Sequence, residues 1–419
     1  MSFSEQTLDL LTAGQYEEAK KKFAWALRKD DDEMVHSLAE ELAALGFTNM
    51  AKRAYEKLLE RYPDEDELRV DLAELAVSAG DDDQALDYLA QIPPTSPAYL
   101  QSLLAAADLY QTQGLFEVAE QKLLEAQRLA PDEQVIQFAL AELYFDIKQY
   151  RKAVAYYLDL IKQGVTHFAQ VNLVQRLGVS YAEAGKFDQA LGYLEQIHEE
   201  DLDADARFQL AFTQLQLKHY DDARQNFEKL RELNPDYATL YPYLADIYVH
   251  QGDSRQALAT LQEGIGVDEY NPQLYERASR LAEQLGDAKL ARQYLQTIVD
   301  QDPDNVTGVR LLSDLLVRQG DAAANRELLT TYLKDGSPDA HLLWNLGRAE
   351  AAQDDYAAAL QHYDAARPEL MSDAAFVRDA ALFYRNAGRR DDARECVAAA
   401  LRFESDDPDM LQLQDELLD

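Results

Sequence analysis

The feature that most constrains the fold is a six-residue phrase that recurs along the chain at a nearly constant interval. It reads GQYEEA from Gly14, GLFEVA from Gly114, GKFDQA from Gly185 and GRRDDA from Gly388. Its first residue falls at positions 14, 46, 80, 114, 148, 185, 218, 252, 286, 320, 354 and 388, and eight of the eleven intervals are 34 residues. A fixed period of this length indicates an array of small structural units that stack on their neighbours.

The residue types around the phrase predict two antiparallel helices in each repeat. We number each repeat so that the phrase begins at position 15, which is Gly in nine repeats and otherwise Lys148, Lys218 or Asp354. A left-handed residue at this position would end the first helix. Position 8 is small and position 7 is Leu or Ala in every repeat from the second onward, so the helix backbones can approach closely. Position 20 is Ala in eleven repeats, and Asn325 is the exception. Prolines after the second helix are expected to begin the connection to the next repeat: Pro63, Pro97, Pro131, Pro235 and Pro303.

This pattern of Leu-small, Tyr, Gly, Ala, large apolar residue and Pro resembles the tetratricopeptide repeat (TPR) family over nearly the whole chain. More narrowly, the chain is similar to long TPR proteins of Gram-positive bacteria. The resemblance implies an all-α, right-handed superhelical solenoid of about twelve helix pairs, in which the first helices line a concave groove. By this register, residues 1–163 form repeats 1–5, residues 164–405 form repeats 6–12, and residues 406–419 form a C-terminal capping helix with Met410, Leu413 and Leu417 on its apolar face.

Two places break the regularity of the array. The one 37-residue interval falls at residues 161–170, where Gly164 is expected to end a helix, and we expect a joint there between repeats 5 and 6. Gly264 and Gly266 both lie in the second helix of repeat 8, which predicts a second soft point because glycine weakens a helix interior.

The composition excludes several classes of function. The net charge of −37 repels nucleic-acid backbones and anionic membranes, and the chain has no apolar run long enough to span a bilayer. The N-terminal MSFSEQTLDLL lacks the basic start and cleavage site of a signal peptide. A single cysteine, Cys396, fits a reducing compartment. We therefore expect a cytoplasmic protein without nucleic-acid or membrane partners.

The motifs of catalysis are missing from the sequence. It contains no GxGxxG, GxxxxGK[ST], GxSxG or HExxH motif, and its seven histidines show no metal-ligand spacing. Adjacent carboxylates such as Asp81 with Asp82 stand at helix starts, where they meet the helix dipole. Cys396 is interpreted as a small packing residue rather than a reactive thiol. We expect no enzyme activity, no metal and no cofactor.

Positions 5, 9 and 12 of the first helix lie opposite its Leu-containing stripe and are the candidate binding face. In repeats 2–5, position 9 is acidic throughout, being Glu40, Glu74, Asp108 and Glu142. Such a row would attract a basic segment, but the solvated face of an acidic protein is the alternative that we favour.

In repeats 5–7 the same face is apolar. The residues concerned are Phe138, Phe145, Val179, Phe208, Phe212 and Leu215. They predict a groove for apolar anchors of a partner, with packing inside the superhelix as the alternative.

In repeats 9–12 the face carries arginines at Arg280, Arg310, Arg348, Arg378 and Arg385, with Arg318 beside them. Arg280 can pair with Glu276 and Arg310 with Asp314 at i, i+4, whereas Arg348, Arg378 and Arg385 have no such partner in their own helix. Trp344 lies one turn before Arg348, and Trp and Arg are frequent at interface hot spots. This cluster is our most specific prediction of a ligand site, for an acidic segment or a chain-terminal carboxylate.

The function that fits these features is a noncatalytic scaffold that binds a protein or peptide in its groove. A peptide-responsive TPR regulator that changes curvature on binding is the alternative, and self-association is a further possibility. Some chaperone-binding TPR proteins hold a terminal carboxylate with Lys at position 5 and Asn at position 9. No position 9 of this chain is Asn, so the resemblance does not extend to that clamp.

Overall fold

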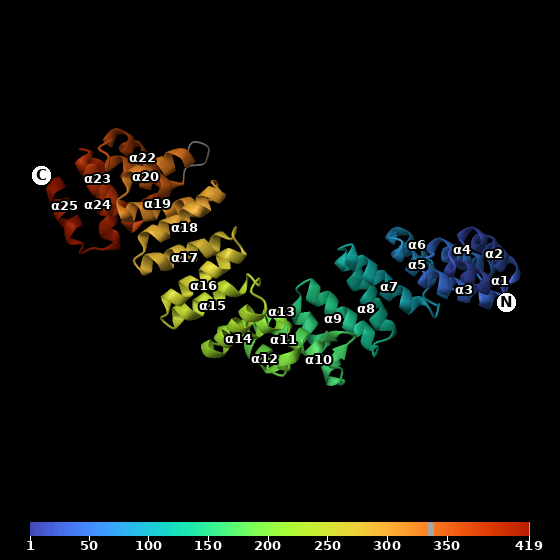
Figure 1. The fold of residues 1–419 in the computed structure, drawn as a ribbon. Coiled ribbons are helices and arrows are strands. Elements are labelled where there is room, and N and C mark those ends of the chain that lie inside the picture. Colours follow the sequence, from blue (N-terminus) through green and yellow to red (C-terminus); the bar gives the residue numbers. More distant parts are fainter. Residues whose placement is uncertain (334–338, 419) are drawn as a thin grey trace. The chain divides into compact units, whose positions relative to one another are not determined.

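The computed structural model describes residues 1–333 and 339–418 and consists there of α-helices with one short β-hairpin and one 3₁₀ turn (Figure 1). Asp419, the last residue of the expected capping segment, lies outside the described residues. The chain divides into two compact units, Met1–Leu217 and Lys218–Asp419. The all-α array of helix pairs is confirmed in both units.

In the first unit, successive helices pair in the order of the sequence. The helices are α1 (Phe3–Thr12), α2 (Tyr16–Lys29), α3 (Asp32–Ala44), α4 (Thr48–Arg61), α5 (Glu67–Ser78), α6 (Asp82–Ala90), α7 (Tyr99–Thr112), α8 (Phe116–Leu129), α9 (Gln134–Asp146), α10 (Tyr150–Lys162), α11 (Leu173–Glu183), α12 (Phe187–Leu194) and α13 (Ala204–Gln216). The hairpin strands β1 (His167–Phe168) and β2 (Val171–Asn172) precede α11, and the 3₁₀ turn η1 (Glu199–Asp201) precedes α13.

The second unit continues the same order of pairing. Its helices are α14 (Tyr220–Leu233), α15 (Leu240–His250), α16 (Ser254–Val267), α17 (Pro272–Gln284), α18 (Ala288–Gln301), α19 (Val306–Gln319), α20 (Ala322–Tyr332), α21 (Ala340–Ala351), α22 (Tyr356–Leu370), α23 (Ala374–Asn386), α24 (Arg390–Phe403) and α25 (Pro408–Leu418). First helices have odd numbers and second helices have even numbers, apart from the final α25.

The repeated phrase is the turn between the two helices, as predicted. The glycines that begin it have φ between 71° and 84°, the left-handed region that costs glycine no steric penalty. Lys148, Lys218 and Asp354 adopt the same conformation, with φ of 59°, 64° and 61°. The turn geometry is therefore kept even where the residue type does not favour it, because the packing of the two helices on each other requires it.

The small residues of the repeat lie where helix backbones meet. Ala39, Ala107 and Ala141 at position 8 are fully buried. At the same position of repeat 11, a Cβ added to Gly347 would come within 2.8 Å of the Tyr363 ring. Position 8 is thus small because the second helix packs directly against it.

The 37-residue interval is occupied by the β-hairpin. In it Phe168 stacks on Phe138 of α9, with ring centroids 4.4 Å apart. The helices on either side, α10 and α11, pack directly on each other. The joint expected at residues 161–170 therefore lies inside the first compact unit, and the division between the units falls at Leu217 and Lys218, within repeat 7.

Local contacts stabilise the first and last helices of the chain, and the glycines of repeat 8 do not interrupt their helix. Ser2 caps α1 in a capping box with Glu5. The predicted apolar face of the capping helix is confirmed, because Met410, Leu413 and Leu417 of α25 are buried. Helix α16 continues through Gly264 and Gly266 without a break.

Candidate functional site: the first-helix face and its pocket in repeats 10–12

Within each compact unit, first helices of consecutive repeats contact one another, as α1 does α3, α11 does α13 and α19 does α21. Their side chains meet in a constant register, in which position 9 of one repeat faces position 6 of the next. Four polar contacts follow this register: Glu142 with Arg176 at 3.2 Å, Asp246 with Arg277 at 3.0 Å, Asp314 with Asn345 at 2.7 Å, and Arg348 with Asp379 at 3.8 Å. Whether a polar side chain at position 9 has a partner on this face therefore depends largely on the residue at position 6 of the next repeat.

The acidic row of repeats 2–5 is divided by this register. Glu142 is engaged by Arg176 and by the hydroxyl of Tyr157. Glu74 and Asp108 are exposed and form no ion pair with any residue that the structure describes. The residues that face these two carboxylates are Ala105 and Ala139. Within the described residues, the two middle members of the row are therefore the ones left without ion pairs.

Asp71 adds a further carboxylate to the start of this row. It faces Glu40 across the repeat boundary, and His36 lies between them, 3.8 Å from Glu40 and 3.6 Å from Asp71. Burial raises the pKa of Asp71 to about 6, with a further contribution from the carboxylates of Glu74 and Glu40 included in that value and His36 acting in the opposite direction. The carboxyl group of Asp71 therefore ionises at a higher pH than that of an ordinary aspartate.

The apolar side chains of repeats 5–7 are largely covered by one another. Phe208 is buried and stacks on Phe212, with ring centroids 6.2 Å apart. Phe138 lies under Phe168, and Phe145 lies under the guanidinium of Arg176 at 4.4 Å. Val179 and Leu215 are half-buried. The predicted residues form a packed apolar surface in which several aromatic rings contact one another.

Most arginines of repeats 9–12 are engaged within the chain. Arg280 pairs with Glu276 at 2.9 Å, as predicted. Arg318 pairs with Glu283 at 2.9 Å, and Arg385 with Glu416 at 3.2 Å. Arg378 pairs with Asp407 at 3.0 Å and with Asp409. Arg378 and Arg385, which lack partners in their own helix, thus find them in or just before α25.

Arg310 behaves differently from the prediction. Its expected partner Asp314 accepts a hydrogen bond from Asn345 instead. In the described part of the chain the exposed Arg310 side chain forms no ion pair. The i, i+4 spacing was therefore misleading here, because the cross-repeat contact takes the carboxylate.

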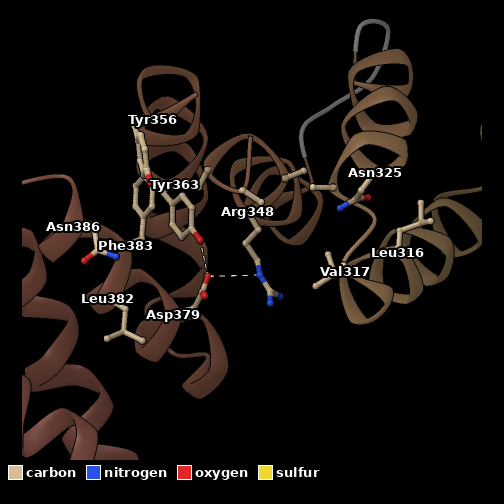
Figure 2. A pocket seen from close by; sticks show the side chains of 15 residues that line it. Leu316, Val317, Asn325, Arg348, Tyr356, Tyr363, Asp379, Leu382, Phe383 and Asn386 are labelled. Atoms are coloured by element: carbon tan, nitrogen blue, oxygen red, sulfur yellow. Dashed lines mark hydrogen bonds and ion pairs between the residues drawn. The ribbon is translucent and has the colours of Figure 1, made fainter. Parts of the chain in front are cut away.

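Arg348 projects into an open cavity of about 410 Å³ between α19, α21 and α23. Figure 2 shows its guanidinium extending between Val317 of α19 and Asp379 of α23. The apolar part of the lining includes Leu316, Val317, Leu382 and Phe383. This groove pocket brings one cation, one carboxylate and several apolar side chains together on the face predicted from sequence.

Trp344 lies beside the pocket rather than in it. Its side chain is 8% exposed, and its ring packs edge-on against Phe376 with centroids 5.5 Å apart. Its indole N–H donates to Asp379 at 2.6 Å, and Arg348 lies over its ring at 5.3 Å. Trp344 was predicted as a contact residue, but its burial makes it a support for Arg348 and Asp379.

Asn325, the exception at position 20, belongs to a buried polar group under the same pocket. Its amide donates to the backbone carbonyl of Asn345 at 3.3 Å, and the side chain of Asn345 donates to Ser313 at 3.1 Å and to Asp314. The Oδ1 atom of Asn325 is buried without a hydrogen-bond partner in the described residues. The sequence marked Asn325 as unusual, whereas Asp379 and Tyr363 were missed because their role depends on cross-repeat contacts.

Other chemistry has little support in the described residues. They contain no group of His, Cys, Asp and Glu arranged to hold a metal ion. Cys396 is fully buried, and burial raises the pKa of its thiol to about 11, which keeps it protonated and unreactive at neutral pH. None of the helices in residues 1–333 and 339–418 combines the length and apolarity needed to cross a bilayer.

Comparison with known sequences gives matches along most of the chain. Models described as YpiA-like tetratricopeptide repeats match residues 111–165 and, for the C-terminal repeats, 341–407. General tetratricopeptide repeat models match residues 42–107, 181–241, 218–276 and 272–305. The TPR repeat-containing protein YpiA of Bacillus subtilis (strain 168) is 32% identical over 416 residues, which cover 98% of each chain.

Comparison with solved structures also gives matches, at low sequence identity. The APC/C hetero-tetramer Cut9–Hcn1 matches with a TM-score of 0.38 and 16% identity over 99% of this chain and 95% of that chain. The C-terminal part of a TPR repeat-containing protein from Cytophaga hutchinsonii matches with a TM-score of 0.46 and 12% identity, covering 65% of this chain and 97% of that chain.

Proposed function

Because this chain belongs to the YpiA-like family of tetratricopeptide repeat proteins, we propose that it is a noncatalytic scaffold that holds a segment of a partner protein against its first helices. The observation that carries this proposal is the groove pocket of repeats 10–12. It is open, it is lined mainly by first helices, and it exposes an arginine beside apolar walls. Pockets with apolar walls and a few convergent polar groups are typical binding sites.

Site-specific photocrosslinking in the source cell tests which face is used. A photoreactive amino acid would replace Val317 or Leu382 in the pocket, or exposed Gln225 and Gln293 on second helices as controls. We expect a defined crosslinked partner from the two pocket positions and none from the controls. Crosslinking that is equal from both faces, or absent from the pocket, would contradict the proposal.

The alternative is a regulator that changes curvature when a signalling peptide binds. Its motivation is the interruption of the repeat period near Gly164, where a hairpin stands between repeats 5 and 6. Small-angle scattering of the full chain with and without a bound peptide distinguishes the two functions. A scaffold keeps its scattering curve, whereas a regulator changes it. Sedimentation at several concentrations tests for self-association in the same samples.

A further inference from the structure

We infer that the groove pocket of repeats 10–12 binds an acidic residue within an extended partner segment, with its carboxylate on Arg348 and an adjacent apolar side chain against Val317 and Leu382. This inference rests on the proposed scaffold function and names the chemistry of its ligand.

The terminal nitrogens of Arg348 are available for a ligand. The nearest carboxylate atom is Oδ2 of Asp379, 3.8 Å from Nε, which is too long for a hydrogen bond. Within the described residues no other carboxylate contacts this guanidinium, and its side chain is 37% exposed. By contrast, Arg318, Arg378 and Arg385 each have a carboxylate oxygen within 3.2 Å. The guanidinium of Arg348 thus lies farther from any carboxylate of the described residues than the guanidinium of each of these three arginines.

The position of Arg348 is fixed although its outer edge is free. Asp379 Oδ2 accepts hydrogen bonds of 2.6 Å from both Trp344 Nε1 and the hydroxyl of Tyr363. Burial and the nearby Asp379 charge raise the pKa of Tyr363, so its hydroxyl stays a neutral donor. The guanidinium carbon of Arg348 lies over the Trp344 ring, 5.3 Å from its centroid. Asp379 and Trp344 are therefore positioning residues that direct the planar fork of Arg348 outward, the geometry that suits a carboxylate.

Apolar side chains are placed to receive the neighbour of that carboxylate. Leu382 is 36% exposed and Tyr356 is 47% exposed, and both line the cavity with half-buried Val317. Covering these side chains with an apolar group would remove their surface from water, which is favourable in proportion to the area covered. A charged residue alone would leave these walls wet, so the pocket favours a carboxylate with an apolar neighbour.

A second arginine, Arg310, lies on the same face of α19 as the pocket residue Val317. Arg310 precedes Val317 by seven residues, which places it two turns away on the same face of α19. It is exposed, and no ion pair involves it in the part of the chain that the structure describes. Two available arginines on one face indicate a segment with more than one acidic residue, rather than a single carboxylate at a chain end.

The experiment selects ligands for the full-length protein from a displayed library of random decapeptides held within a loop, so that no chain end is free. We expect enrichment of Asp or Glu next to an apolar residue. A selected peptide should bind Arg348→Gln about tenfold more weakly, the loss of one charge-assisted contact. Arg231→Gln is the matched control, since Arg231 pairs with Glu263 between second helices at 3.4 Å.

The Asp379→Asn variant separates binding from structure. Asparagine keeps an oxygen for Trp344 and Tyr363 but removes the like charge beside the ligand, so affinity should rise by a few fold. Opposite effects of Arg348→Gln and Asp379→Asn are expected only if the carboxylate meets Arg348. Equal losses in both variants would assign these residues a structural role and overturn the inference.

Two further outcomes would also overturn it. If the loop library shows no enrichment of acidic residues, the pocket does not select a carboxylate within a segment. If enrichment appears only in a second library with free C-termini, the pocket binds a terminal carboxylate instead. If the pocket positions still crosslink a partner in the cell, either result leaves the scaffold function standing while this inference fails.

Discussion

The carboxylate of Glu142 in repeat 5 lies 3.2 Å from the guanidinium of Arg176, 34 residues later in the chain. The two residues stand at position 9 of one repeat and position 6 of the next, the register that recurs through both units. Both side chains are less exposed than a typical surface pair, at 20% and 34%. Together with pairs inside one helix, such as Glu276 with Arg280, this register decides which charges on the first-helix face are neutralised and which remain for a partner.

Removing the Glu142–Arg176 pair should cost more than removing a surface pair. A double-mutant cycle of Glu142→Gln and Arg176→Gln should give a coupling energy of about 1 kcal/mol, because both groups are partly desolvated. Lys57 and Glu60 are the control, an exposed pair at 2.6 Å whose coupling should be about 0.3 kcal/mol. Urea unfolding measures both cycles, and equal coupling energies would contradict the prediction.

Replacing Lys148, whose backbone is in the left-handed conformation, with glycine should stabilise the folded chain. Lys148 has φ of 59°, where a Cβ atom costs about 1 kcal/mol that glycine avoids. Lys148→Gly should therefore raise the midpoint of thermal unfolding, while Lys148→Ala, which keeps the Cβ, should not. Calorimetry of the two variants checks the sign, and a matching rise in Lys148→Ala would point to the loss of charge instead.

The two glycines of α16 should respond in opposite directions to alanine. A Cβ on Gly264 would come within 2.7 Å of Tyr241 Cβ, so Gly264→Ala should destabilise the chain by about 1–3 kcal/mol through overpacking. Gly266 has no atom within 4 Å of the added Cβ, so Gly266→Ala should stabilise it by up to about 1 kcal/mol. Thermal unfolding of the pair gives the answer, since each variant is the other's control for helix propensity.

Asp71 should make stability fall as the pH rises from about 4 to about 6. Its carboxyl has a pKa of about 6 in the folded chain, above the ordinary value near 4. Between these values the folded state holds a proton that the unfolded state has lost, so raising the pH favours unfolding. Asp71→Asn should remove this pH dependence. The difference in stability between the variant and the native chain should therefore favour the variant more at pH 7 than at pH 4.

The groups around Asp71 define the control for this measurement. Glu40, Glu74 and Tyr55 face the same region, with His36 between the acids. Asp87, an exposed carboxylate with no ion pair in the described residues, provides Asp87→Asn as the matched change of charge. A parallel shift of both variants at every pH would show that net charge, and not the environment of Asp71, governs the effect.

Much of the candidate site was visible in the sequence, and some of its chemistry was not. The period and the helical face predicted Arg348 and Arg310 as residues of the binding face, and Arg348 lines the pocket. The same reasoning grouped Arg378 and Arg385 with them, although both are neutralised by residues in or near α25. It also treated Trp344 as a contact residue, because spacing gives the face of a helix and not the depth at which a side chain lies.

By itself, the sequence determined the array. A glycine, an alanine and a small residue at fixed spacing predict the turn, the second helix and the close backbone contact, because these are local steric requirements repeated in each unit. Apart from pairs inside one helix, such as Glu276 with Arg280, the tertiary structure decided which charges are free, since partners such as Arg176 of Glu142 stand about 34 residues away in the next repeat. That contact depends on how two helices pack, and helix packing sets Asp379 beside Arg348 and leaves Glu74 opposite an alanine.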